Sequence, residues 1–181
     1  MLSRYGLAVA ALLTLAACGD APPPQKFADI RFPNSDPIRL GVTTVELASD
    51  FQPSFQPPQV EQYFPVPPQR AIENWARDRL RADNSGSDYH AKVTIMNAEA
   101  DERPGSGGYD IRVEARIEIV DAHGFVVRSA HAEATRGKTI EADATPDEKD
   151  QLWYAITRDA VGNLGGELER QIRGTFYPYV L

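Results

Sequence analysis

Residues 109–119 alternate strictly between apolar and charged side chains, and this pattern constrains the fold more than any other feature of the chain. A period of two is typical of a strand that packs one face on a core and exposes the other to water. The apolar positions are Ile111, Val113, Ala115, Ile117 and Ile119, and the charged positions are Asp110, Arg112, Glu114, Arg116 and Glu118. The chain is therefore expected to build a sheet with one solvated face.

The segments on both sides of this strand predict further strands of the same sheet. Their apolar faces are formed by Ala91, Val93 and Ile95 in the first segment and by Ala130, Ala132 and Ala134 in the second. Turn residues at 121–124 predict a hairpin before the second segment, and its small side chains would let a helix approach closely. A fourth strand is expected over residues 37–49, with a slip in the alternation near Thr43 and Thr44 that indicates a bulge.

Two helices are expected to cover this sheet. The first begins at Pro67 or Pro68, and its apolar stripe is formed by Ile72, Trp75, Ala76 and Leu80. The second begins with a capping box in which Thr145 is the cap and Glu148 reaches back to it. Gly174 is expected to end this helix. Gly162, Gly165 and Gly166 interrupt its interior and indicate either close packing on the alanine-rich strand or a bend.

The predicted fold is α+β, with a mostly antiparallel four-stranded sheet and two helices packed on one face. The order of elements is β-α-β-β-β-α, and it occupies residues 37–174 as a single domain. Residues 175–181 form an aromatic C-terminal tail. Between the first strand and the first helix, residues 50–69 contain six prolines and exclude a regular helix or an interior strand.

The aromatic residues of this crossover and of the tail are candidates for partner binding, because exposed aromatic side chains mark interfaces. These candidates are Phe55, Tyr63, Phe64, Phe176, Tyr177 and Tyr179. An alternative for the crossover is that its aromatic side chains pack onto the sheet or the helices. An exposed sheet edge could also recruit a strand of a partner.

The front of the chain indicates export. Arg4 precedes an uncharged apolar run that is shorter than the ~20 residues of a membrane-spanning helix. The run ends in Leu15-Ala16-Ala17-Cys18, which resembles the bacterial lipobox, and an ordinary secretory signal with a chance cysteine is the alternative. The resemblance implies that residues 1–17 are removed and that Cys18 is acylated. Residues 18–36 then form a lipid-anchored, proline-rich tether, and the position of Asp20 favours the outer membrane over the inner one.

Composition excludes several function classes. The chain carries 19 Lys and Arg against 26 Asp and Glu, a net charge of −7, which argues against nucleic-acid binding. Cys18 is the only cysteine, and the three histidines lack metal-ligand spacing. We find no nucleophile motif, although Ser129 and His131 share a strand face, and we expect no catalytic residue, no metal and no cofactor.

The order of strands and helices behind a lipobox resembles the auxiliary lipoproteins of ABC-type transport systems. The resemblance is carried by "IRLGVTTVEL", "WARDRLRA" and "IRVEARIEI". The chain resembles more loosely the lipoprotein that plugs the lipopolysaccharide-translocating barrel. The resemblance implies a non-enzymatic, periplasm-facing accessory lipoprotein that binds an envelope protein in transport or assembly. A carrier of a lipid or small apolar ligand, with a pocket between sheet and helices, is the alternative, and an envelope hydrolase is a further one.

Overall fold

The computed structural model describes residues 27–33 and 36–181. The predicted signal segment, Cys18 and most of the predicted tether lie outside the described residues. The elements in chain order are β1 (Ile38–Leu40), β2 (Val45–Ser49), the 3-10 helix η1 (Glu61–Tyr63), α1 (Pro68–Arg79), β3 (Leu80–Ala82), β4 (Tyr89–Arg103), β5 (Gly108–Asp121), β6 (Val126–Thr139) and α2 (Pro146–Thr175).

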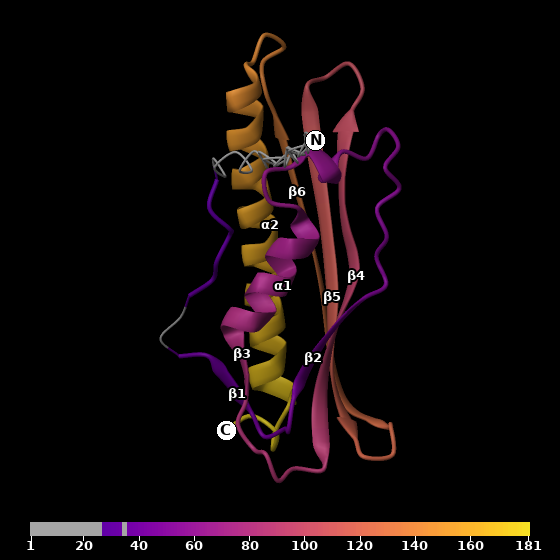
Figure 1. Ribbon diagram of the computed structural model, residues 1–181, viewed down its shortest axis with the longest axis vertical. Helices are drawn as coiled ribbons and strands as arrows, with labels where there is room; N and C mark the ends of the chain where they lie inside the picture. Colours follow the sequence, from indigo (N-terminus) through magenta and orange to yellow (C-terminus); the bar gives the residue numbers. More distant parts are fainter. Residues whose placement is uncertain (1–26, 34–35) are drawn as a thin grey trace, which may run out of the picture.

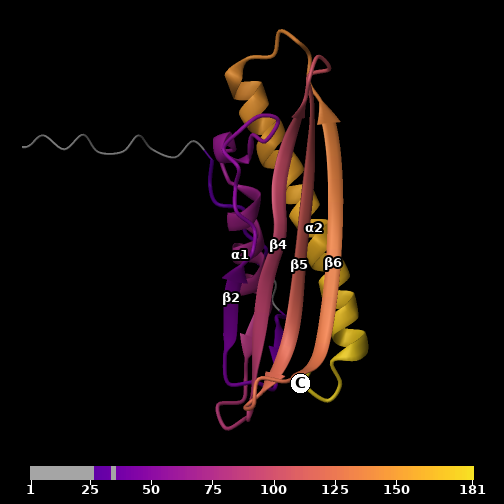
Figure 2. The same ribbon diagram turned by 90° about the vertical axis from the view of Figure 1, so that its right-hand side faces the viewer.

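The main sheet has four strands in the order β2-β4-β5-β6, and this confirms the predicted α+β class. β2 runs parallel to β4, while β4, β5 and β6 form an antiparallel meander. The long strands lie side by side on one side of the molecule, and α1 and α2 cover the same face of the sheet (Figures 1 and 2). The opposite face carries the charged positions of β5 and is solvated.

The prediction that residues 37–49 form a single strand with a bulge is wrong. The chain turns at Gly41, where the Val42 N–H donates to the Leu40 carbonyl at 2.8 Å, and the two halves enter different sheets. β1 pairs in parallel with β3, directly after α1, and only β2 joins the main sheet. The slip in alternation therefore marks a change of sheet and not a bulge.

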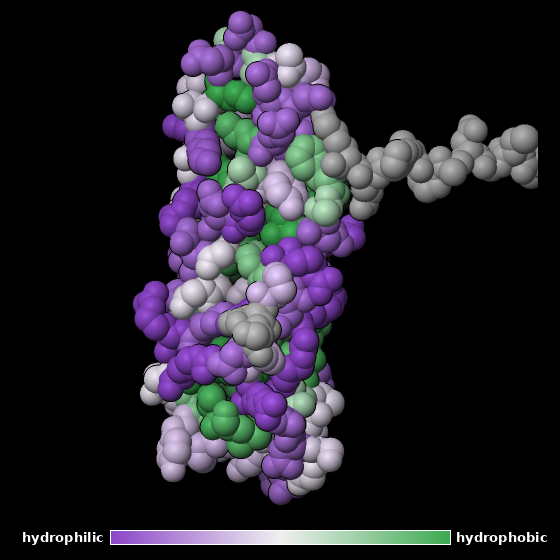
Figure 3. Space-filling model, turned by 90° about the vertical axis from the view of Figure 1, so that its left-hand side faces the viewer, coloured by the Kyte–Doolittle hydropathy of each residue, from purple (hydrophilic) through white to green (hydrophobic). Residues whose placement is uncertain are grey.

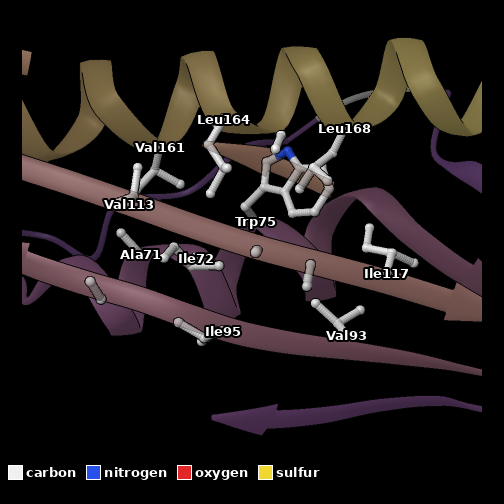
Figure 4. Close-up of a cluster of buried hydrophobic side chains, with 14 of the residues drawn as sticks. Ala71, Ile72, Trp75, Val93, Ile95, Val113, Ile117, Val161, Leu164 and Leu168 are labelled. Carbon is white, nitrogen blue, oxygen red and sulfur yellow. The ribbon is translucent and has the colours of Figure 1, made fainter. Parts of the chain in front are cut away.

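The core fills the space between the sheet and the two helices. The inward positions of β4 and β5 meet one stripe from each helix, as Figure 4 shows. Trp75 of α1 is 2 % exposed and lies against α2 beside Leu164 and Leu168. This confirms that Trp75 belongs to the core.

Both helix starts are as predicted. Pro68 is the first residue of α1, and the Thr145 side chain accepts from the Glu148 N–H while the Glu148 carboxylate accepts from the Thr145 N–H. α2 continues to Thr175, one residue beyond Gly174, because Phe176 still donates its N–H to the Ile172 carbonyl at 3.0 Å. No helix within the described residues is long and apolar enough to span a bilayer.

Candidate functional site

Two of the six candidate aromatic residues are core residues, so the expectation that they are exposed is wrong. Phe176 is fully buried, and Phe64 is 4 % exposed. The Phe64 ring stacks on Trp153 of α2 with a centroid distance of 4.9 Å. The crossover thus packs Phe64 onto α2, as expected from the alternative in which its aromatic side chains pack onto the sheet or the helices. Phe176, the first residue after α2, lies in the core at the end of that helix.

Tyr179 is half-buried, and the C-terminal tail pairs antiparallel with β1 through a bridge between Leu40 and Val180. The Gly41 N–H donates to the Tyr179 carbonyl at 2.7 Å, and the Leu181 N–H donates to the Arg39 carbonyl at 3.0 Å. The Tyr179 ring meets the Tyr89 ring edge-on at 4.9 Å, and the Arg128 guanidinium lies 5.7 Å from its centre. The tail is therefore part of the folded domain.

Four of the six large exposed hydrophobic residues in the described part of the chain belong to the β5–β6 hairpin and the C-terminal tail. Both segments lie at the same end of the molecule (Figure 1). Phe125 and Val126 of the β5–β6 hairpin are 69 % and 51 % exposed, and Tyr177 and Leu181 of the tail are 81 % and 66 % exposed. We call these four residues the end surface. Arg128 joins its two parts by donating to the Tyr177 carbonyl at 3.2 Å.

The segment before β1 is fixed along α1. Asp29 pairs with Arg70 at 2.8 Å, the Ile30 carbonyl accepts from Asn74 at 3.1 Å, and the Phe32 N–H donates to Asp78 at 2.9 Å. The three helix residues are four positions apart and share one face. The sequence interpretation assigned this segment to the tether and gave no signal for these contacts.

The remaining exposed candidates, Phe55 and Tyr63, lie in the crossover, where they are 68 % and 66 % exposed. Phe55 lines a cavity of about 710 Å³ against α1, and Tyr63 lines a second cavity of about 780 Å³ against the β4–β5 hairpin. Figure 3 shows small hydrophobic patches along this face, near its two ends and around its middle, among hydrophilic residues.

The Trp75 indole fills the space that Gly165 leaves where α1 meets α2. An added Cβ at Gly165 would lie 2.1 Å from the Trp75 indole nitrogen, so this glycine admits Trp75 of α1 and does not face the alanine-rich strand. Gly162 and Gly166 line a hollow of about 260 Å³ on the outer side of the helices, beside Phe32. The room left by the helix glycines is therefore outside the sheet–helix interface.

Among the three histidines, His131 makes the shortest side-chain contact that the described residues show. The His131 Nε2 lies 2.7 Å from Glu114 Oε1, on the solvated face of the sheet. Across residues 27–33 and 36–181, no three potential metal-ligating side chains from His, Cys, Asp or Glu form a group.

The β6 edge of the sheet is partly occupied by the chain's own side chains. The Gln171 amide of α2 accepts from the His131 N–H at 3.1 Å and donates to the His131 carbonyl at 2.8 Å. Arg128 and Arg136 donate to the carbonyls of Val127 and Thr135, at 2.7 and 2.8 Å. These contacts disfavour the addition of a partner strand at β6.

No protein-family model matches the chain, and no curated protein matches it. Among solved structures, the chain is similar to a DUF330-family protein from Xanthomonas campestris at 14% identity and a TM-score of 0.41, over 80% of this chain and 94% of that one. It is also similar to a minor lipoprotein from Acinetobacter baumannii at 13% identity and a TM-score of 0.43, over 75% and 93%. A third likeness is to lipoprotein GNA1162 from Neisseria meningitidis at 15% identity and a TM-score of 0.28, over 69% and 97%.

Proposed function

We propose that this chain is a membrane-anchored accessory lipoprotein of the bacterial cell envelope that binds a protein partner through the end surface. The observation that carries the proposal is the exposure of four large hydrophobic side chains, Phe125, Val126, Tyr177 and Leu181, in two segments at one end of the domain. Exposed apolar and aromatic side chains that gather in one region mark interaction sites, whereas scattered ones need no explanation.

The placement of the end surface suits an anchored protein. The Phe27 ring lies 5.3 Å from Tyr154 in the first third of α2, while Tyr177 follows the last turn of that helix. At about 1.5 Å per residue, the two places are about 30 Å apart along α2. A lipid on Cys18 would attach to the domain through residues that join it at Phe27, so the end surface would be held away from the membrane.

The finer parts of the proposal depend on the lipobox and on the resemblance to auxiliary lipoproteins. They are acylation at Cys18, a periplasm-facing position with the outer membrane favoured, and a non-enzymatic part in transport or envelope assembly. The partner is expected to present an apolar patch, because the end surface offers mainly apolar area for burial.

Site-specific photocrosslinking in the bacterial membrane tests the partner. A photoreactive amino acid replaces Tyr177 in one version of the full chain and Tyr63 in another, since both positions are more than 60 % exposed and lie in different regions. We expect one discrete adduct from position 177, identified as an envelope protein by mass spectrometry and recovered reciprocally with that protein as bait. An adduct from position 63 alone, or from neither position, would contradict the end surface as the interface.

Acylation is tested on the same preparation. The N-terminal peptide of the membrane-bound protein should begin at Cys18 and carry the mass of a diacylglyceryl thioether, and Cys18→Ser should abolish this modification. A membrane-bound protein that retains residues 1–17 would overturn the anchor.

A further inference from the structure

A cavity in the crossover region has the features of a binding site that is separate from the end surface. Its volume is about 710 Å³, within the ~300–1,000 Å³ typical of small-molecule sites. The walls come from the crossover, from the first turns of α1 and from β4. Phe51, Pro53 and Phe55 supply apolar and aromatic area, and Ala98 of β4 contributes to the floor.

The cavity occupies a gap in the pairing of β4 with the chain beside it. Pairing with β2 ends where the Asp50 and Phe51 N–H groups both donate to the Ile95 carbonyl, at 2.9 and 3.3 Å. It resumes where the Val60 N–H donates to the Ala100 carbonyl at 2.8 Å. Alternate residues of a strand direct their backbone groups to the same side, so Ala98 directs its N–H and C=O into the gap as Ala100 does.

A buried carboxyl group lies at this gap. Glu61 is 2 % exposed, and its Oε2 accepts from the Ala100 N–H at 3.4 Å. Its Oε1 is buried and has no hydrogen-bond partner within the described residues. The neighbouring Gln62, which also lines the cavity, has a buried Oε1 that is unpartnered in the same part of the chain. Two buried acceptor oxygens without donors are costly unless a bound molecule supplies the donors.

The other charged groups of the cavity are matched. Arg70 pairs with Asp29 at 2.8 Å, and Arg77 pairs with Glu73 at 3.1 Å. Three acidic residues line this cavity, and among the described residues only Glu61 has no ion pair with a cation. The charge balance therefore favours a cationic ligand over an anionic one.

Phe55 adds an unusual feature at the rim. Its backbone φ of 56° lies in the left-handed region, which a bulky aromatic residue rarely adopts. The ring is nevertheless 68 % exposed, so burial of the ring does not offset the cost of this backbone conformation. Strained residues of this kind cluster at ligand sites. An aromatic face at the rim suits an organic cation or its apolar substituent.

We infer that this cavity binds a protonated primary amine that carries an apolar substituent. The ammonium group donates to Glu61 Oε1 and Gln62 Oε1, and the apolar part lies against Phe51, Pro53 and Phe55. The amine belongs either to a free small molecule or to an ethanolamine-type lipid headgroup. The inference goes beyond the proposed function and does not depend on the end surface.

Calorimetric titration of the mature chain carrying Cys18→Ser tests the inference. The probes are 2-phenylethylammonium and its neutral analogue 2-phenylethanol, which share the apolar part and differ in the charged donor. We expect the ammonium to bind about 10–100-fold more tightly than the alcohol, as a charge-assisted hydrogen bond provides. Equal affinity for the two probes, or no binding of either, would overturn the inference.

Variants assign the binding to this cavity. Glu61→Gln keeps the side-chain volume and should abolish the preference for the ammonium, while Glu46→Gln removes a carboxylate from an exposed position of β2 and should leave it unchanged. Phe55→Ala changes an exposed side chain, is expected to fold normally, and should weaken the ammonium about 5–30-fold. Unchanged ammonium binding in both Glu61→Gln and Phe55→Ala would place the amine elsewhere and refute the proposed site.

A third probe distinguishes the two sources of the amine. Dihexanoylphosphatidylethanolamine is titrated below its micelle concentration beside the matching phosphatidylcholine, which lacks N–H donors. Tighter binding of the ethanolamine lipid than of 2-phenylethylammonium assigns the site to a headgroup, and the reverse order assigns it to a free amine. Equal binding of the ethanolamine and choline lipids, together with equal binding of the two phenyl probes, would contradict both sources. A negative result in the crosslinking experiment would leave these titrations unaffected.

Discussion

The side chain of Asp78 joins the segment before β1 to the first helix. Its carboxylate accepts from the Arg31 guanidinium Nε at 2.9 Å and from the Phe32 N–H at 2.9 Å, and the side chain is 8 % exposed. The Arg31 hydrogen bond lowers the pKa of Asp78 below its ordinary value of 3.8, with help from the Phe32 N–H and against the effect of burial. A carboxyl group with a depressed pKa stabilises the folded state in its ionised form.

The pH dependence of stability follows from this direction. The contribution of Asp78 is fully present above its unfolded pKa and is lost as the pH falls through the lower pKa of the folded chain. We expect Asp78→Asn to lower the free energy of unfolding by about 1–3 kcal/mol at pH 7. The difference from the wild type should shrink below about pH 4, as measured by urea unfolding across the pH range.

Asp83→Asn is the matched control, since Asp83 is half-exposed and its contact with Arg39 is 3.5 Å long. It should change the unfolding free energy by less than about 1 kcal/mol. A difference for Asp78→Asn that stays constant down to pH 2 would show that the ionised carboxylate does not provide the stabilisation.

The packing of α1 on α2 depends on one glycine among three. The Trp75 indole occupies the space beside Gly165, whereas an added Cβ at Gly162 or Gly166 would meet no atom from another described part of the chain within 4 Å. A glycine costs ~1 kcal/mol against alanine in a helix interior, so its presence at 165 is explained by the close approach of Trp75. The contacts found here give no account of the other two glycines.

Alanine substitution separates these roles. Gly165→Ala should destabilise the domain by about 1–3 kcal/mol, because the indole would have to move within a closely packed core. Gly166→Ala on the same helix should stabilise it by about 0.5–1 kcal/mol through helix propensity. Thermal unfolding monitored by circular dichroism measures both, and a shift of the two variants in the same direction would contradict the assigned contact.

An ion pair provides a second link between these helices. The Arg79 guanidinium holds both oxygens of Glu169, at 2.6 and 2.7 Å, and its side chain is 7 % exposed. A two-point contact of this kind fixes orientation as well as distance. Together with Trp75 and Gly165, it sets how α1 crosses α2 and therefore where the crossover and its cavity lie.

The whole molecule has one long sheet with two differently protected edges. β2 and the crossover lie along β4, while β6, within the described residues, pairs only with β5 and is covered at His131 by Gln171. An unpaired edge of this length is a template for association with a second chain. The side-chain contacts at β6 therefore help keep the sheet from extending.

Removal of the Gln171 amide should promote association through β6. In the mature chain with Cys18→Ser, we expect Gln171→Ala to strengthen self-association about tenfold, because the His131 N–H and C=O become available to a second edge. Sedimentation velocity over a range of concentrations measures the effect. Gln151→Ala, at an exposed position of the same helix, is the control, and identical behaviour of the two variants would exclude a protective role for Gln171.

The sequence by itself determined the features that depend on neighbouring residues. The alternation at 109–119, the hairpin after it and the Thr145–Glu148 capping box act over a few positions, so the meander and the start of α2 could be predicted. The core role of Trp75 followed from helical spacing. Exposure could not be predicted in the same way, since Phe64 and Phe176 have sequence surroundings like those of Tyr63 and Tyr177.

The tertiary structure alone decided which surfaces meet. It split the opening segment between two sheets, buried Phe64 against Trp153, and assigned Gly165 to Trp75 of the other helix. It also placed Glu61 at a gap in the edge of β4, where one carboxyl oxygen is buried without a donor in the described part of the chain. These outcomes depend on contacts between segments far apart in the chain. A pattern of neighbouring residues therefore cannot predict them.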